Sequence, residues 1–171
     1  MNFRVRQLTS DDVEAFRTIR LEALQDSPEA FGGDYAHESQ QPIESFLRQI
    51  THSAIFGAFA ASTLKGVVGL FWDSAQKRRH LGHLYTVYVS PDARGTGMGL
   101  PIIEAALTYA QSRGLLQVML GVAVPNTPAI KLYRRAGFEI YGTEPRSLFV
   151  NGRYIDEHLM VRFLDRDAVQ S

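Results

Sequence analysis

The sequence predicts a mixed α/β domain whose sheet is antiparallel at both ends and contains one parallel pair near its centre. Apolar, strand-like runs joined by short turns occur before residue 90 and again after residue 138. Between them, Leu81 to Val124 follows the order strand, helix, strand, and such a crossover makes its two strands parallel. At 171 residues the chain is long enough for one hydrophobic core, so we expect a single domain over residues 1–171.

The first half of the chain predicts two helices and four strands. A strand is expected around residues 3–5, and the sequence TSDD then supplies a side-chain cap for a helix over residues 10–25. A short helix over residues 42–50 has Pro42 in its first turn, where a missing N–H costs nothing. Three strands of an antiparallel meander are then expected at residues 54–61, 66–73 and 83–89.

The second half predicts two more helices and the remaining strands. Helical spacing follows Gly99 and ends at Gly114, a good C-terminal cap, and a nearly continuous apolar strand covers residues 116–124. A helix over residues 127–137 has a Thr-Pro start and a Gly stop. A strand is expected at residues 138–142, and Asn151-Gly152 joins two final strand patterns as a hairpin turn. The total is about seven strands and about four helices.

Composition excludes several classes of protein. Eighteen basic and 18 acidic residues cancel, which argues against nucleic acid or an anionic membrane as the main partner. The chain has no cysteine, so disulfides, thiolate zinc sites and cysteine nucleophiles are excluded. No apolar run reaches the roughly 18 residues of a membrane span, and the N-terminus lacks a secretory signal, so a cytoplasmic protein is expected. The five histidines lack metal-site spacing, and we expect no metal.

A glycine-rich turn, SPDARGTGMG, runs from Ser90 to Gly99 between a strand and a helix. Unpaired N–H groups converge at such a turn and the helix dipole favours negative charge, so this arrangement predicts an anion site. A dinucleotide fingerprint would need a glycine where Leu100 stands, and the G-K-[ST] triplet of a P-loop is absent. Both common nucleotide motifs are therefore excluded.

The segment RGTGMG, from Arg94 to Gly99, resembles the pyrophosphate-binding motif of the GNAT superfamily of N-acetyltransferases, which use acetyl-coenzyme A. Asn126, Ala129 and Tyr133 have the matching N-x-x-A-x-x-x-Y spacing, and a Gly-Phe pair follows. The order of elements also agrees over nearly the whole chain. The resemblance implies a GNAT fold, in which a mostly antiparallel sheet contains a central, splayed parallel pair.

The resemblance also implies roles for individual residues. It assigns Tyr133 as the acid that protonates the coenzyme A thiolate, whereas pattern alone favours a core aromatic. Asn126 is expected either to contact the cofactor or to satisfy N–H groups of its own turn. A backbone N–H of residues 87–89 is the expected oxyanion donor. The implied cofactor-binding residues are Val87, Tyr88, Val89, Arg94, Gly95, Thr96, Gly97, Met98, Gly99, Leu100 and Asn126.

The general base and the acceptor pocket are less sharply defined by the sequence. His83 is the candidate base, because it titrates near neutrality and shares a strand face with Tyr85, which Val87 joins if the strand is regular. Glu22 and Tyr85 are lesser candidates, and a water relay is the alternative. The loop from Asp26 to Pro42 is expected to form one wall of the acceptor pocket. The expected substrate-binding residues are Phe31, Tyr85 and Glu22.

Taken together, these features predict an acyltransferase that moves the acetyl group of acetyl-coenzyme A to a primary amine. Because no cysteine can form an acyl-enzyme, we expect direct attack in a ternary complex. The expected partner is a small-molecule or peptide amine, and the exposed C-terminal strands allow a homodimer. The alternative is a non-catalytic acyl-coenzyme A sensor, although a pure sensor needs no acid at Tyr133. A nucleic-acid binder is disfavoured.

Overall fold

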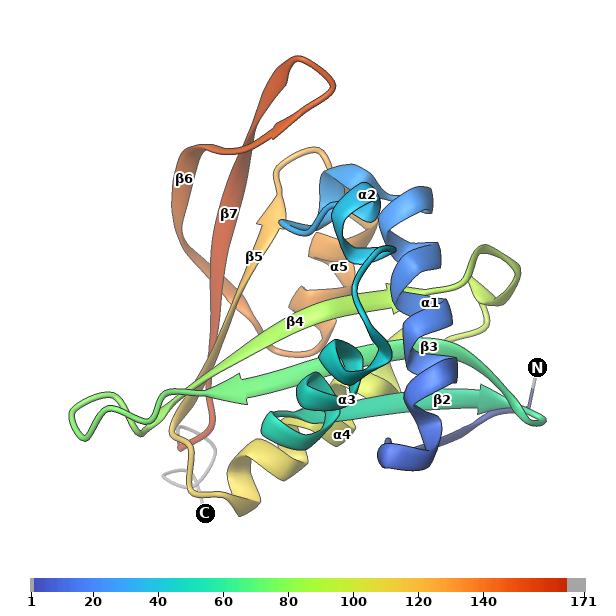
Figure 1. The fold of residues 1–171 in the computed structure, drawn as a ribbon. Helices are drawn as coiled ribbons and strands as arrows, with labels where there is room; N and C mark the ends of the chain where they lie inside the picture. The colour runs from blue at the N-terminus through green and yellow to red at the C-terminus, as the bar shows by residue number, and fades with distance from the viewer. Residues whose placement is uncertain (1, 166–171) are drawn as a thin grey trace.

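A seven-stranded sheet in the order β1-β2-β3-β4-β5-β7-β6 organises the protein in the computed structural model, which describes residues 2–165 (Figure 1). Neighbouring strands are antiparallel except β4 and β5, which run parallel, as predicted. The strands are β1 (Arg4–Gln7), β2 (Ala54–Ala60), β3 (Thr63–Trp72), β4 (Leu81–Val89), β5 (Gln117–Ala123), β6 (Glu139–Val150) and β7 (Arg153–Phe163).

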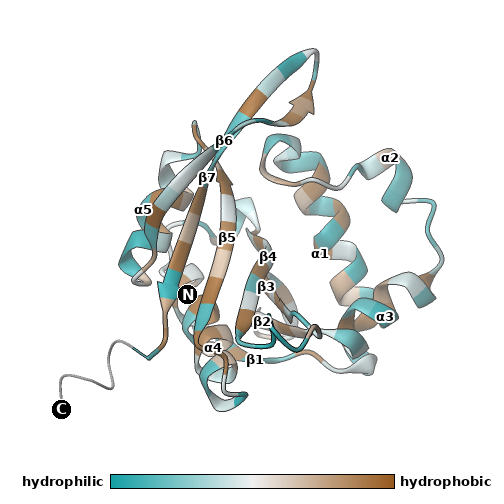
Figure 2. Ribbon diagram, turned by 90° about the vertical axis from the view of Figure 1, so that its left-hand side faces the viewer, coloured by the Kyte–Doolittle hydropathy of each residue, from teal (hydrophilic) through white to brown (hydrophobic). Residues whose placement is uncertain are grey.

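Helices cover both faces of this sheet, α1 to α3 on one side and α4 and α5 on the other (Figures 1 and 2). The short α2 was not predicted from the sequence; its N-cap Asp34 accepts a hydrogen bond from the N–H of Ala36 over 3.0 Å. No helix within residues 2–165 is long and apolar enough to cross a membrane. The helices are α1 (Val13–Asp26), α2 (Tyr35–Glu38), α3 (Ile43–His52), α4 (Gly99–Ser112) and α5 (Thr127–Arg135).

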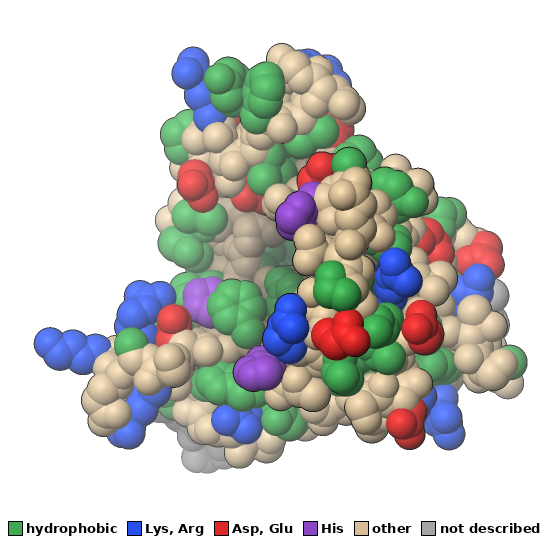
Figure 3. Space-filling model, viewed as in Figure 1, with side chains coloured by type: hydrophobic (Ala, Val, Ile, Leu, Met, Phe, Trp, Pro, Cys, Tyr) green, Lys and Arg blue, Asp and Glu red, His purple; other side chains and the backbone are tan. Residues whose placement is uncertain are grey.

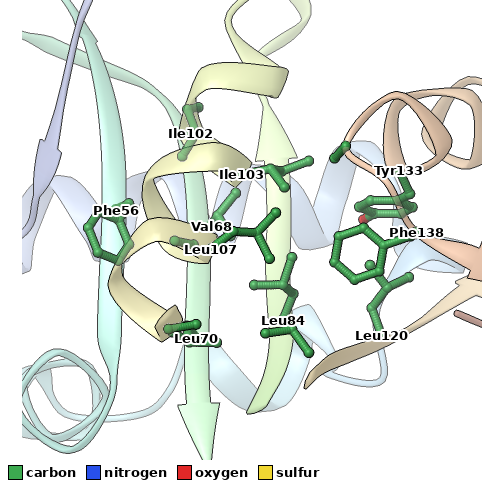
Figure 4. Close-up of a cluster of buried hydrophobic side chains, with 14 of the residues drawn as sticks. Phe56, Val68, Leu70, Leu84, Ile102, Ile103, Leu107, Leu120, Tyr133 and Phe138 are labelled. Carbon is green, nitrogen blue, oxygen red and sulfur yellow. The ribbon is translucent and has the colours of Figure 1, made fainter. Parts of the chain in front are cut away.

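Two apolar clusters hold the helices to the sheet, one on each face. On the α1 side, the buried rings of Phe16 and Phe46 meet edge to face with their centroids 6.3 Å apart. On the other side, α4 packs closely on β3: a Cβ on Gly66 would lie 2.6 Å from Cδ1 of Ile102. Burying each large apolar side chain contributes about 1.5–3 kcal/mol. Figure 4 shows this cluster, with Ile102, Ile103 and Leu107 of α4 over Val68, Leu70 and Leu84.

A bulge interrupts β4 at Thr86. Tyr85 pairs with Gly69 and Tyr88 with Val67, so β4 has one more residue than β3 between these two pairs. Thr86 is buried and has φ +50°, a left-handed conformation that costs a residue with a Cβ roughly 1–2 kcal/mol. Past the bulge, Val87 packs with the α4-side cluster. It therefore does not share the face of Tyr85, as a regular strand would have required.

The C-terminal hairpin confirms the predicted Asn-Gly turn. Asn151 and Gly152 have φ +51° and +75°, which are the signs of a type I′ turn. The two segments expected before this turn form one long strand, β6, whose register shifts between Glu144 and Leu148. Pro145 lies in this shift and has no N–H for the ladder. The hairpin rises above the rest of the sheet in Figure 1.

A charged pair fixes the start of α1. Asp12 accepts hydrogen bonds from Nη1 and Nη2 of Arg6, both over 2.7 Å, and from the N–H of Thr9 over 2.8 Å. The Arg6 hydrogen bonds are the largest cause that lowers the pKa of Asp12, to about 2. The two side chains are 35% and 12% exposed, so solvent screening reduces the strength of the pair.

We predict that Asp12→Asn lowers the free energy of unfolding at pH 7 by about 1–2 kcal/mol. Because the folded-state pKa lies below the ordinary value, this contribution is present above about pH 4 and is lost as the pH falls through about 2. Urea unfolding of the wild type and the variant between pH 2 and pH 7 measures the difference. The neighbouring exposed Asp11→Asn is the control, and a pH-independent difference would contradict the prediction.

Candidate functional site

A cavity of about 770 Å³ lies where β4 and β5 separate. The two strands pair only from Leu81–His83 to Gln117–Met119, after which β5 continues beside β7. Beyond this point the edge of β4 that faces the gap has no strand neighbour within residues 2–165, and its backbone groups, apart from the Val89 carbonyl that accepts from Arg94, can pair with an extended ligand. Figure 3 shows a hollow on this face of the molecule, between the β6–β7 hairpin and the α1–α2 region.

The glycine-rich turn forms one wall of this cavity. Gly95 and Gly97 line it with φ +76° and +85°, a region that side chains with a Cβ rarely adopt. A Cβ built on either glycine would meet no protein atom within 4 Å, so their free sides face open space. The first N–H groups of α4, which begins at Gly99, have no intrahelical partners. Backbone donors and helix dipole together make this wall suitable for an anion.

Arg94 lines the cavity beside these glycines. Its Nε donates to the carbonyl of Val89 over 3.1 Å, its Nη2 donates to the carboxylate of Asp26, and its guanidinium lies over the Tyr88 ring. Burial raises the pKa of Asp26, but hydrogen bonds from Ser27 and Arg94 outweigh it and leave the pKa lowered. A guanidinium has five N–H donors, so Arg94 keeps donors for an anion while bound to Asp26.

Tyr133 of α5 faces the gap from the other side. It is 6% exposed, lines the cavity and meets Phe138 edge to face. In Figure 4 its hydroxyl end points toward the β4 side of the gap. The hydroxyl has no hydrogen bond to any described residue from 2 to 165. Burial raises the pKa of the phenol well above its ordinary value, so Tyr133 is protonated at neutral pH.

Asn126 also lines the cavity and is the N-cap of α5. Its Oδ1 accepts from the N–H of Ala129 over 3.3 Å. The side-chain oxygen therefore pairs with an N–H at the start of α5, and the side-chain NH₂ group still has its N–H donors available. The remaining predicted cofactor-binding residues, except Thr96, line the same cavity, namely Val87, Tyr88, Val89, Met98, Gly99 and Leu100.

A buried ion pair connects the helices of the α1 side to the bulge. Arg20 of α1 donates to both carboxylate oxygens of Glu38 in α2, over 2.8 and 2.6 Å, and to Oγ1 of Thr86 over 3.1 Å. The side chains of the pair are only 10% and 17% exposed. One arginine thus holds the acceptor-side loop and the strained residue of β4 together. Nothing in the spacing of these residues along the chain predicts this contact.

Of the predicted substrate-binding residues, Phe31 and Tyr85 line the cavity. The Tyr85 hydroxyl hydrogen-bonds Oγ of Ser53 over 2.6 Å, and burial raises the pKa of its phenol. The Tyr85 ring packs directly on Gly69: a Cβ built on Gly69 would lie 2.3 Å from Cε1 of the ring. Glu22 lies outside the cavity lining and accepts a 3.1 Å hydrogen bond from the hydroxyl of Tyr88.

His83 lies outside the cavity lining as well. Its Nε2 is 3.1 Å from Oδ2 of Asp73, and its ring stacks on Phe71 with centroids 4.7 Å apart. The hydrogen bond from His83 is the largest cause that lowers the pKa of Asp73.

A cavity-lining residue that the sequence reasoning missed is Glu157 of β7. No group of three or more His, Asp or Glu side chains in the described part of the chain could hold a metal ion.

Comparison with known proteins identifies the class to which this fold and cavity belong. The model of the acetyltransferase (GNAT) family matches residues 17–138. A GNAT acetyltransferase of Streptococcus pneumoniae superposes with a TM-score of 0.86 at 22% identity, covering 95% of this chain and 100% of that one. An acetyltransferase of Salmonella typhimurium, solved with acetyl-coenzyme A, gives 0.84 at 22% identity, covering 97% and 96%.

Curated relatives agree with this class. A mycothiol acetyltransferase of Saccharomonospora viridis is 36% identical over 122 residues, 65% of this chain and 40% of that protein. The chain spans about half the length of the curated relatives it matches. The chain belongs to the acetyltransferase (GNAT) family. The family and the fold predicted from the sequence are confirmed.

We predict that Glu38→Ala lowers the free energy of unfolding by about 3 kcal/mol, because it leaves the buried Arg20 without its counter-charge. Chemical unfolding at pH 7 measures this loss. The control is Glu29→Ala, which removes an exposed partner 3.7 Å from Arg153 and should change stability by less than about 0.5 kcal/mol. Equal effects of the two substitutions would contradict the role given to Arg20.

Proposed function

We propose that the protein transfers the acetyl group of acetyl-coenzyme A to a primary amine by direct attack within a ternary complex. The observation that carries this proposal is the presence, in one cavity, of an anion-binding glycine turn and a buried, protonated tyrosine. The acetyl-coenzyme A bound to the Salmonella neighbour supports the choice of co-substrate. The chain offers no cysteine for an acyl-enzyme, which supports direct attack.

The cavity residues divide into three tasks. Arg94 and the N–H groups that begin α4 would bind the pyrophosphate. The free edge of β4 from Val87 to Val89 would pair with the pantetheine amides in the manner of an added strand. The bound thioester supplies the activated acetyl group. A backbone N–H beside the bulge at Thr86 would stabilise the oxyanion that develops on its carbonyl.

The proton transfers follow from this arrangement. The unprotonated amine forms the new N–C bond, the C–S bond breaks, and the amine gives up one proton to a base or to water. Tyr133 delivers a proton to the departing thiolate. The phenol is protonated at neutral pH and so has a proton to give, and it regains a proton from solvent after the thiol leaves.

We expect saturating acetyl-coenzyme A to raise the melting temperature of the wild type by roughly 5 °C or more, since a ligand that binds only the folded state stabilises it. Gly97→Ala should reduce the affinity at least tenfold, because its Cβ enters the open space in front of the turn. Gly114→Ala is the matched control, with φ +77° and equally open surroundings at the end of α4. A wild type that shows no shift would refute the proposed function.

Replacing Tyr133 by Phe should lower kcat by roughly 100-fold while the KM for acetyl-coenzyme A changes less than about twofold. The phenol makes no hydrogen bond within residues 2–165, so the loss of its oxygen should leave folding intact. Thiol release with a panel of primary amines gives the rates. Tyr109→Phe is the control, because Tyr109 of α4 packs edge to face on Phe56 and does not line the cavity. Unchanged turnover of Tyr133→Phe would remove its role as acid, and binding without turnover in the wild type would indicate a sensor.

A further inference from the structure

Glu157 is the one carboxylate among the residues that line the cavity in the described part of the chain. Three arginines also line it: Arg20, Arg94 and Arg135. Arg94 belongs to the phosphate-binding wall, Arg20 is already paired with Glu38, and Arg135 belongs to α5, which lies on the α4 side of the sheet. On the α1 side the cavity lining therefore has one negative charge, Glu157, and one arginine that is already paired.

The strand geometry places Glu157 on the face opposite α4. Leu120 and Val122 of β5 belong to the α4-side cluster, so Gly121 between them faces the α1 side. Glu157 pairs with Ala123, and its carboxylate leans back over Gly121: a Cβ on that glycine would lie 3.4 Å from Oε2. The glycine leaves the carboxylate next to the backbone of β5, within the cavity.

The irregular part of β6 holds this carboxylate in place. Within the register shift, Arg146 has φ +52° and its N–H donates to Oδ1 of Asp156 over 2.8 Å. This turn brings the Ser147 hydroxyl to Oε2 of Glu157, over 2.5 Å. Glu157 has no ion-pair partner within residues 2–165. The carboxylate is thus oriented by a neutral donor and keeps its full charge for a ligand.

We propose that Glu157 binds the acceptor amine as it enters the cavity in its ammonium form, before a base or water removes the proton and the neutral amine attacks, and that the preferred acceptors are primary amines without a carboxylate on the adjacent carbon. This inference rests on the proposed function. A carboxylate beside the amine would meet the Glu157 charge, and Arg20, the arginine of α1 that lines the cavity, is already paired with Glu38. The two ends of the cavity then carry opposite charges: a cationic end binds the pyrophosphate and an anionic end binds the amine.

The test uses two matched pairs of acceptors, tyramine with tyrosine and agmatine with arginine. The members of each pair differ only in the α-carboxylate. We expect the wild type to show at least tenfold higher kcat/KM for the decarboxylated member. Glu157→Gln, whose amide oxygen still accepts from Ser147, should raise the KM for the amine at least tenfold and reduce the preference below about threefold. The KM for acetyl-coenzyme A should stay within about twofold.

Glu144→Gln is the control, because Glu144 is exposed, pairs with Glu157 across the β6–β7 ladder and does not line the cavity. Calorimetric titration of tyramine and agmatine into protein saturated with coenzyme A gives an independent readout, with at least tenfold weaker binding expected for Glu157→Gln. Equal use of the amino acids, no amine binding by the wild type, or an unchanged KM in Glu157→Gln would overturn the inference. Failure of the proposed function would give a different result: acetyl-coenzyme A would not raise the melting temperature, or no thiol would be released.

Discussion

The separation of β4 from β5 is the constraint on which the rest of the site depends. Interior strands of a sheet normally satisfy the backbone groups of both neighbours, and here that pairing stops after His83. The bulge at Thr86 turns the following residues of β4, and its left-handed conformation persists only because its surroundings hold it. Arg20 is bonded to the Thr86 hydroxyl and is itself fixed by Glu38. The cavity therefore depends on a chain of contacts that begins at α2, far from the glycine turn.

Local signals made much of the fold predictable. The parallel crossover, the Asn151-Gly152 turn and the glycine turn before α4 each depend on residues close together in the sequence, where backbone preference decides the conformation. Even so, four residues of α2 escaped notice, because a single turn of helix leaves no apolar period to detect.

Long-range side-chain contacts account for what the sequence did not reveal at the site. Arg20 lies 66 residues from Thr86, and the orientation of Glu157 depends on a register shift in a neighbouring strand. Nothing in the spacing of His83 and Tyr85 distinguishes them, yet one stacks on Phe71 outside the cavity and the other lines it. The glycine turn that carries the family motif lines one end of the cavity, and its conformation was predictable because backbone preference decides it. The acceptor end is built from single side chains.

The zero net charge of the chain does not reveal how charges are distributed within the cavity. The formal balance argues against nucleic acid or an anionic membrane as the main partner, but the potential inside a cavity is set by the few charges that line it. At the end lined by the glycine turn, Asp26 holds Arg94 in position while some of its N–H donors stay free, so the arginine is not an isolated unpaired charge. At the other end, Ser147 orders Glu157 without neutralising it. In both places a partner within the chain positions the charged group while leaving it able to bind an external ion.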